Sequence, residues 1–165
     1  SKKSANLICK KSKFLALNAQ INASNIGFHT IRNYKNFNTL LINEKEIRHE
    51  MRDKISKLEV LMSSLSKEKN IKNLIVTRGS NGAILYYKKN NKFYYVGAYA
   101  SKIVDKIGAG DTMLSLIGPC LKFNIDSDIS LLISSLAASQ SVGMMGNKEP
   151  VNKLTMLKAL ENILK

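Results

Sequence analysis

The fold is decided at Val104-Asp105-Lys106-Ile107-Gly108-Ala109-Gly110-Asp111-Thr112, which runs directly into an apolar helical pattern. Gly108 and Gly110 free the backbone to turn sharply and let a ligand approach closely. A glycine turn at a helix N-terminus presents amide groups and the positive end of the helix dipole, so it suits an anion. The stretch therefore predicts an anion site at the start of a buried helix.

Asp111 stands in the middle of this predicted anion site. A carboxylate there repels an anionic ligand, and removing the proton from a hydroxyl that attacks a phosphoryl group would explain its presence. The alternative is an ordinary helix entry in which Asp111 is only a favourable first-turn charge. The residues of this turn alone leave both interpretations open.

Composition indicates a globular protein. The chain has 165 residues, 44% of them hydrophobic, which predicts one domain with a substantial core over residues 1–165. No apolar run reaches the length of a membrane span, and the basic start is not followed by a signal-peptide core. Cys9 and Cys120 lack metal or redox spacing. We expect a cytoplasmic protein without membrane contacts.

The formal net charge of +14 favours anionic partners. Nucleic-acid binding is one interpretation, but the lysines are scattered through loops, and the chain has no tryptophan and no interleaving of aromatic and basic residues. A general preference of the sequence for Lys, Asn and Ile explains the charge more simply. We therefore expect no specific nucleic acid, whereas nucleotides and sugar phosphates fit the charge.

Apolar runs predict the strands of an α/β sheet. Short, continuously apolar runs indicate buried strands, and two runs on either side of a polar loop indicate a hairpin. The predicted strands are residues 14–18, 38–42, 74–77, 83–87 and 93–96. Residues 1–13 form a polar lead-in, either a helix end or an exposed connection.

Helical patterns occupy much of the remaining chain. The predicted helices are residues 44–65, 112–123, 126–142 and 152–164. Alternation of strands and helices argues for α/β layers. A complete doubly wound sheet would have more strands, so we expect the chain to be a portion of a larger domain.

Loop segments of the kind that bind ligands each follow a predicted strand or begin a predicted helix. They are residues 20–27, 43–46, 77–82 and 108–111. Because the carboxyl ends of parallel strands share one edge of a sheet, we expect these loops to meet in a single crevice. That expectation favours the catalytic interpretation of Asp111.

The motifs resemble those of a known family. Asp105-Lys106-Ile107-Gly108-Ala109-Gly110-Asp111 is similar to the second signature, Asp-Thr-x-Gly-Ala-Gly-Asp, of the ribokinase-like, phosphofructokinase-B type carbohydrate kinases. Asn43-Glu44-Lys45-Glu46 resembles the family's Asn-x-x-Glu motif, and Val76-Thr77-Arg78-Gly79-Ser80-Asn81-Gly82 its Thr-x-Gly-x-x-Gly phosphate loop. Residues 14–23 are most similar to the branch typified by heptose-phosphate kinases, often fused to nucleotidyltransferases. The resemblance implies the C-terminal portion of a ribokinase-like three-layer α/β fold.

The resemblance also implies a reaction, the transfer of the ATP γ-phosphate to a hydroxyl of a sugar or sugar phosphate. Asp111 would be the general base, and the amides of Gly108, Ala109, Gly110 and Asp111 would form the anion hole. Asn43 and Glu46 would act on Mg²⁺, mostly through water. For these two residues, a helix cap with a surface charge is the alternative.

The nucleotide would be bound at two further segments. Thr77 and Gly79 would approach the ATP phosphates while Gly82 keeps the turn open; a plain β-turn is the alternative. Residues 138–147 resemble the family's adenine-binding strip, where Ala138 lets the purine lie against a helix and Asn147 meets the base or ribose. Tight helix packing explains the same small residues without a ligand.

Two departures from the family pattern limit what the resemblance implies. Lys106 stands in place of the usual Thr and Ile107 follows it, which affects the monovalent-cation site that the family has near Asp105 and Ile107. The family's N-terminal half, with its Gly-Gly sugar-binding motif and lid, is not found in this sequence. We expect that half, or a second copy in a homo-oligomer, to supply the sugar side. A non-catalytic nucleotide-binding or assembly module is the alternative function.

Overall fold

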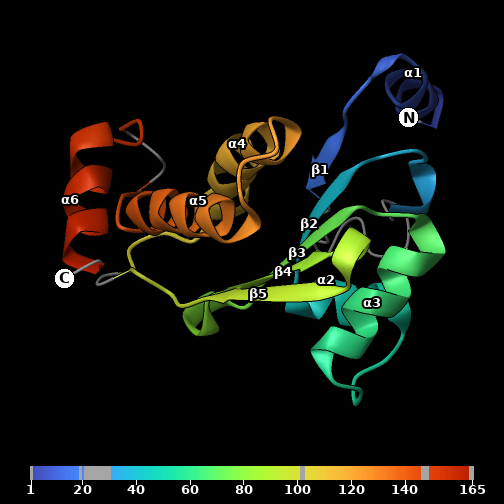
Figure 1. Ribbon diagram of the computed structural model, residues 1–165, viewed down its shortest axis with the longest axis horizontal. Helices are drawn as coiled ribbons and strands as arrows, with labels where there is room; N and C mark the ends of the chain where they lie inside the picture. The colour runs from blue at the N-terminus through green and yellow to red at the C-terminus, as the bar shows by residue number, and fades with distance from the viewer. Residues whose placement is uncertain (1, 19, 21–30, 101–102, 146–148, 164–165) are drawn as a thin grey trace. The chain divides into compact units, whose positions relative to one another are not determined.

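A computed structural model describes residues 2–18, 20, 31–100, 103–145 and 149–163. A sheet with the strand order β1-β2-β3-β4-β5 runs through it (Figure 1). The strands are β1 (Ala16–Asn18), β2 (Thr39–Asn43), β3 (Asn73–Thr77), β4 (Ala83–Tyr87) and β5 (Lys92–Val96). The helices are α1 (Lys2–Lys11), α2 (Glu44–Met51), α3 (Leu58–Lys69), α4 (Ala109–Lys122), α5 (Ser127–Val142) and α6 (Lys153–Ile163), with short 3-10 turns η1 (Ile31–Asn33), η2 (Gly79–Asn81) and η3 (Lys88–Asn90). The predicted α/β fold class is confirmed.

The contacts divide the chain into two compact units. Unit 1 comprises residues 1–78 and 84–94, and unit 2 comprises residues 79–83 and 95–165. Single-domain behaviour over residues 1–165 stays a prediction. Within the described residues, no helix is both long enough and apolar enough to cross a membrane.

The first strands of unit 1 are parallel. β2 pairs with β1 on one side and with β3 on the other, with Thr39 opposite both Ala16 and Asn73. The Asn38 side chain accepts the Leu15 amide at 2.9 Å, and its carbonyl accepts the amides of Lys72 and Asn73 at 3.0 and 3.1 Å. Asn38 therefore joins the starts of all three strands, which sets their register.

β4 reverses direction relative to β3. The Lys88 amide, just after β4, donates to the carbonyl of Lys72, just before β3, at 3.0 Å. β4 and β5 are joined only by the 3-10 turn η3 and one further residue, so they form the hairpin that the sequence predicted. Tyr86 and Phe93 stack across this hairpin with ring centroids 4.7 Å apart.

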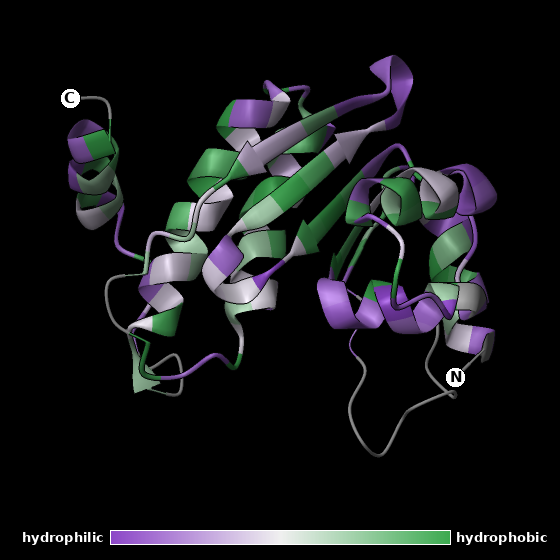
Figure 2. Ribbon diagram, turned by 90° about the horizontal axis from the view of Figure 1, so that it is seen from below, coloured by the Kyte–Doolittle hydropathy of each residue, from purple (hydrophilic) through white to green (hydrophobic). Residues whose placement is uncertain are grey.

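The core of unit 1 lies between these strands and the helices α2 and α3. Alternate residues of each strand face the helices because side chains alternate across a strand. The core includes Leu40, Ile42, Leu74, Val76, Ile84 and Tyr86 from the strands, and Ile47, Leu58, Leu61, Met62 and Leu65 from the helices. Figure 2 shows that the central strands are mainly hydrophobic, as buried parallel strands should be.

One prediction for unit 1 was wrong. The helix expected over residues 44–65 is broken, because Arg52 adopts a left-handed conformation (φ 52) that ends α2. Asp53 then accepts hydrogen bonds from the Ile55 and Ser56 amides, both at 2.9 Å, and forms a turn before α3. The lead-in over residues 1–13, for which a helix end or an exposed connection was expected, contains the helix α1.

Unit 2 is helical after β5. α4 packs against α5, and its buried residues Met113, Ile117 and Leu121 are spaced four apart, which places them on one face. Gln140 on α5 accepts the Asn152 amide at 3.0 Å, just before α6 begins. The predicted helix 126–142 matches α5, and the helix predicted over residues 152–164 matches α6 within the described residues.

Candidate functional site

The carboxyl ends of β2 and β3 bring two of the predicted site residues together. The register places Asn43 directly opposite Thr77, the last residue of each strand. Both residues are half-buried, so they lie near the surface at one edge of the sheet. The loops 43–46 and 77–82 therefore start from one edge of the sheet, whereas the expectation that the loops meet in a single crevice stays a prediction. Whether the loop 108–111 shares that edge stays a prediction.

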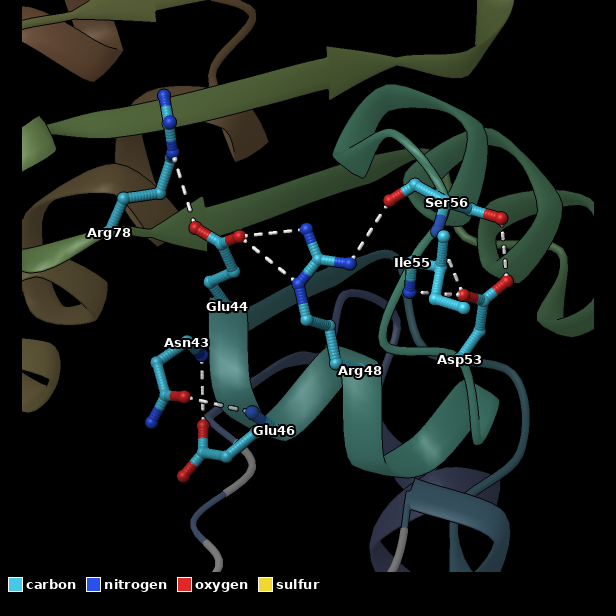
Figure 3. Close-up of polar contacts among 8 residues, drawn as sticks. All are labelled: Asn43, Glu44, Glu46, Arg48, Asp53, Ile55, Ser56 and Arg78. Atoms are coloured by element: carbon cyan, nitrogen blue, oxygen red, sulfur yellow. Dashed lines mark hydrogen bonds and ion pairs between the residues drawn. The ribbon is translucent and has the colours of Figure 1, made fainter.

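Asn43 and Glu46 hold each other at the start of α2 (Figure 3). Asn43 Oδ1 accepts the Glu46 amide at 2.9 Å, and Glu46 Oε2 accepts the Asn43 amide at 2.8 Å. This reciprocal arrangement is a capping box, which satisfies amides that the helix itself leaves without acceptors. A helix cap is therefore present, and Glu46 is not a surface charge, because it is only 8% exposed. The role of the two residues with Mg²⁺ stays a prediction.

A charged group beside this cap was missed in the sequence. Glu44 Oε1 accepts two hydrogen bonds from Arg48, at 3.1 and 2.9 Å, and Glu44 Oε2 accepts one from Arg78 Nε at 3.4 Å. Arg48 also donates to the Ser56 carbonyl at 3.0 Å. The spacing of Glu44 and Arg48, four residues apart on a helix, was a readable signal. The pair with Arg78 required knowing that β3 lies beside β2.

The turn after β3 depends on glycine. Gly79 and Gly82 have φ angles of +59 and +76, and the Gly82 amide donates to the Gly79 carbonyl at 3.1 Å. A Cβ at Gly82 would lie 1.9 Å from the Val96 carbonyl oxygen, whereas one at Gly79 would meet nothing within 4 Å. The residues form a short 3-10 turn closed by this i→i+3 hydrogen bond, which fits the β-turn alternative. The close approach of Val96 therefore requires glycine at position 82 whether or not a ligand binds at this turn.

The helix α4 starts in a different way. Gly108 is its N-cap, in the left-handed region (φ 84), and provides no side-chain hydrogen bond to this end. The first intrahelical bond runs from the Thr112 amide to the Gly108 carbonyl at 2.9 Å. Helix geometry therefore places the amides of Ala109 and Gly110 at the open end of the helix. Asp111 lies in this first turn and its side chain is exposed.

The position of Gly110 corrects the sequence analysis. The helix was expected to begin at Thr112, with both glycines in the preceding turn. It begins at Ala109, so Gly110 is a helical residue and only Gly108 has the positive φ of a turn glycine. The tight turn thus needs one glycine, and Gly110 leaves the first turn of α4 without a side chain at that position.

The lead-in to this turn is tied to the end of α5. The amides of Val104 and Asp105 both donate to the Val142 carbonyl, at 2.9 and 3.1 Å. Asp105 Oδ1 accepts the Ile107 amide at 2.9 Å. The start of the glycine stretch therefore lies at the carboxyl end of the helix that carries Ala138, which is half-buried. Asn147 lies outside the described residues.

A direct metal cage is not present among the described residues, where no three His, Cys, Asp or Glu side chains gather at metal-binding distance. Asn43 and Glu46 do offer amide and carboxylate oxygens, the hard ligands that Mg²⁺ prefers. One oxygen of each is used in the capping box. This donor set fits a hydrated ion bound through water.

The sequence matches a family model over most of its length. Residues 5–154 match the model of the pfkB family carbohydrate kinases. The chain belongs to this family. It is also 32% identical over 117 residues to the bifunctional protein HldE of Campylobacter concisus, in an alignment that covers 69% of this chain and 24% of that protein.

Solved structures show the same fold for this pfkB family member. The ribokinase of Thermotoga maritima matches with a TM-score of 0.76 at 20% identity, over 94% of this chain and 52% of that one. The Arabidopsis thaliana ribokinase, solved with ribose and ATP, matches with a TM-score of 0.73 at 21% identity, over 97% and 51%. The ribokinase-like fold is confirmed. The chain spans about half the length of these structures and about a quarter of the HldE protein.

Proposed function

We propose that this chain carries the nucleotide-binding and phosphoryl-transfer residues of an ATP-dependent kinase for a sugar or sugar phosphate. The observation that carries the proposal is the start of α4, where Gly108 opens the helix without a side-chain cap and Asp111 is exposed in the first turn. Membership of a family of carbohydrate kinases supports it. The resemblance of residues 14–23 to the heptose-phosphate kinase branch favours a heptose phosphate as the acceptor.

Asp111 is the proposed general base. A carboxylate in the first turn of α4 can take the proton from the attacking sugar hydroxyl, and the positive end of the helix then favours the anionic groups that gather there. The amides of Gly108, Ala109, Gly110 and Asp111 would donate to the phosphoryl oxygens as charge develops. Because these donors are part of the backbone, they are oriented before the substrate binds.

Asn43 and Glu46 are the proposed metal residues, acting through water. Mg²⁺ at this place would neutralise charge on the phosphates and hold them in line for transfer. The capping box fixes both side chains at the end of β2, so they would orient bound water without moving. Thr77, opposite Asn43, would donate its hydroxyl to a phosphate oxygen.

The remaining contacts concern the rest of the nucleotide. Gly79 and Gly82 would let the phosphates approach the turn after β3 closely. Ala138 would present a small surface of α5 to the purine, and Asn147 is proposed to meet the base or ribose. An additional monovalent cation is proposed near Asp105 and Ile107.

The test is the substitution Asp111→Asn, assayed in the protein that carries this chain with a panel of sugars and sugar phosphates. Loss of a general base lowers turnover by about 10²–10⁴-fold. Mg-ATP affinity, measured by calorimetry, should stay within about twofold because the backbone donors remain. Asp128→Asn, at an exposed first-turn aspartate of α5, is the matched control and should change neither quantity. Full turnover in Asp111→Asn would exclude Asp111 as the base.

A second candidate function is a nucleotide-binding module without transfer. It is favoured by the same start of α4, because a glycine helix end can hold an anion without transferring it. This candidate expects Mg-ATP to raise the thermal unfolding temperature while no sugar is phosphorylated under any condition. Phosphorylation of any sugar that depends on Asp111 would reject it.

A further inference from the structure

Glu44, Arg48 and Arg78 form a charged group at the carboxyl ends of β2 and β3 (Figure 3). The two oxygens of Glu44 are divided between the two arginines, Oε1 to Arg48 and Oε2 to Arg78. Arg48 also interacts with the Asp53 carboxylate, so Arg78 is the arginine of the group whose charge is less compensated. An arginine of this kind at the surface attracts anions.

Arg78 has donors that this group does not use. Among the described residues, the Arg78 side chain donates one hydrogen bond, from Nε to Glu44 Oε2. A guanidinium carries five N–H donors, and the four on the Nη atoms lie beyond the contact with Glu44, on the side away from Arg48 (Figure 3). The side chain is 31% exposed. A planar fork of donors that is accessible from solvent matches the oxygens of a phosphate.

We propose that Arg78 binds the phosphate chain of the nucleotide and that Glu44 is its positioning residue. The proposal rests on the proposed function, because it adds a residue for the same nucleotide. Arg78 directly follows Thr77, which lies opposite Asn43 at the ends of β3 and β2. Its guanidinium therefore starts from the strand ends where the phosphates are proposed to bind.

Glu44 can act on this site in two opposite ways. Its contact with Arg78 restricts the arginine side chain in advance, so less conformational entropy is lost when a ligand binds. Its charge also repels a phosphate, but two arginines already share that charge. Ordering should therefore outweigh repulsion. Loss of Glu44 should weaken phosphate binding rather than strengthen it.

The experiment is a calorimetric titration of this chain with Mg-ADP, inorganic tripolyphosphate and adenosine. Arg78→Met should weaken the binding of Mg-ADP and tripolyphosphate about tenfold, because it removes charge-assisted hydrogen bonds. Adenosine affinity should stay within about twofold. Lys89→Met, at the exposed turn η3 beside the opposite ends of the strands, removes the same charge and should leave all three affinities unchanged.

Glu44→Gln tests the positioning role. It should weaken tripolyphosphate binding about threefold, and Arg78→Lys should fall between the parent and Arg78→Met. The double variant Glu44→Gln/Arg78→Met should bind no more weakly than Arg78→Met, because Glu44 acts only through Arg78. Stronger binding by Glu44→Gln, or losses that add in the double variant, would overturn the positioning role.

The outcomes separate this proposal from the proposed function. If the parent chain binds Mg-ADP and Arg78→Met binds it within twofold, the role of Arg78 is wrong and nucleotide binding stands. If the parent binds tripolyphosphate through Arg78 but does not bind Mg-ADP, phosphate binding stands and the nucleotide function is wrong. A parent that binds neither overturns both.

Discussion

The turn after β2 and the glycine turns of unit 2 build their loops by different means. After β2, the side chains of Asn43 and Glu46 complete the hydrogen bonds of the helix start. In unit 2, Gly79, Gly82 and Gly108 adopt positive φ angles, and α4 begins without a side-chain cap. A helix start capped by side chains has those backbone amides satisfied without a ligand. A helix end left open by glycine keeps its amides available for a ligand.

Gly82→Ala should have the largest effect on stability, since its Cβ would lie 1.9 Å from the Val96 carbonyl oxygen at a φ of +76. Backbone must move, and strain in the left-handed region adds to the overlap, so unfolding free energy should fall by roughly 3 kcal/mol. Urea denaturation followed by circular dichroism measures the loss. Gly79→Ala is the matched control, with open space and a φ of +59, and should cost only about 1 kcal/mol. If Gly82→Ala and Gly79→Ala lost the same unfolding free energy, the overlap with the Val96 carbonyl oxygen would not explain the need for Gly82.

Asn43→Ala should come next, because it removes one bond of the capping box and leaves the Glu46 amide without its acceptor. The expected loss of unfolding free energy is about 1–2 kcal/mol. Asn43→Ser retains an oxygen that can cap the helix and should lose less than about 0.5 kcal/mol. The same urea titrations compare the two variants. If serine were as damaging as alanine, capping would not explain the role of Asn43 in folding.

Gly108→Ala should cost about 1 kcal/mol, since a Cβ is disfavoured at a φ of +84. Gly108→Asn should cost less, because asparagine enters the left-handed region more readily. If the open helix end binds phosphate, both variants should also lower Mg-ATP affinity in calorimetry. If both variants lowered the unfolding free energy but left Mg-ATP affinity unchanged, the start of α4 would not be the phosphate site.

The smallest expected effect is a change of stability with pH, which comes from Asp53 in the turn that follows α2. Hydrogen bonds from the Ser56 hydroxyl and from the Ser56 and Ile55 amides lower the pKa of Asp53 from 3.8 to about 2. A carboxyl whose pKa is depressed on folding stabilises the fold above its unfolded pKa and loses that contribution as pH falls through the folded value. The urea midpoint of the parent should therefore approach that of Asp53→Asn between pH 3.8 and about 2. A constant difference over this range would contradict the assignment.

Much of the fold could be predicted because the signals were local. Continuous apolar runs identified β2 and β3, and the polar loop between aromatic-rich runs identified the hairpin. The break at Arg52 was missed because neither glycine nor proline marks it. Its cause is the Asp53 side chain, which competes for backbone amides that a continuing helix would use.

Only part of the candidate site could be predicted, because some of its contacts join residues that are far apart in the sequence. Asn43 and Thr77 were found from local motifs, and their pairing follows from the parallel register. The contact of Glu44 with Arg78 joins residues 34 positions apart, and no local sequence pattern predicts it. Sequence therefore found the backbone features of the site better than its network of charges.

The capping box changes what the Asn-x-x-Glu motif says about evolutionary history. Asn43 and Glu46 each complete the other's backbone hydrogen bond, so purifying selection on folding alone would retain both. A descendant that had lost phosphoryl transfer would still keep the pair to start α2. The presence of this pair is therefore explained by the start of α2 and is not by itself evidence of metal-dependent transfer.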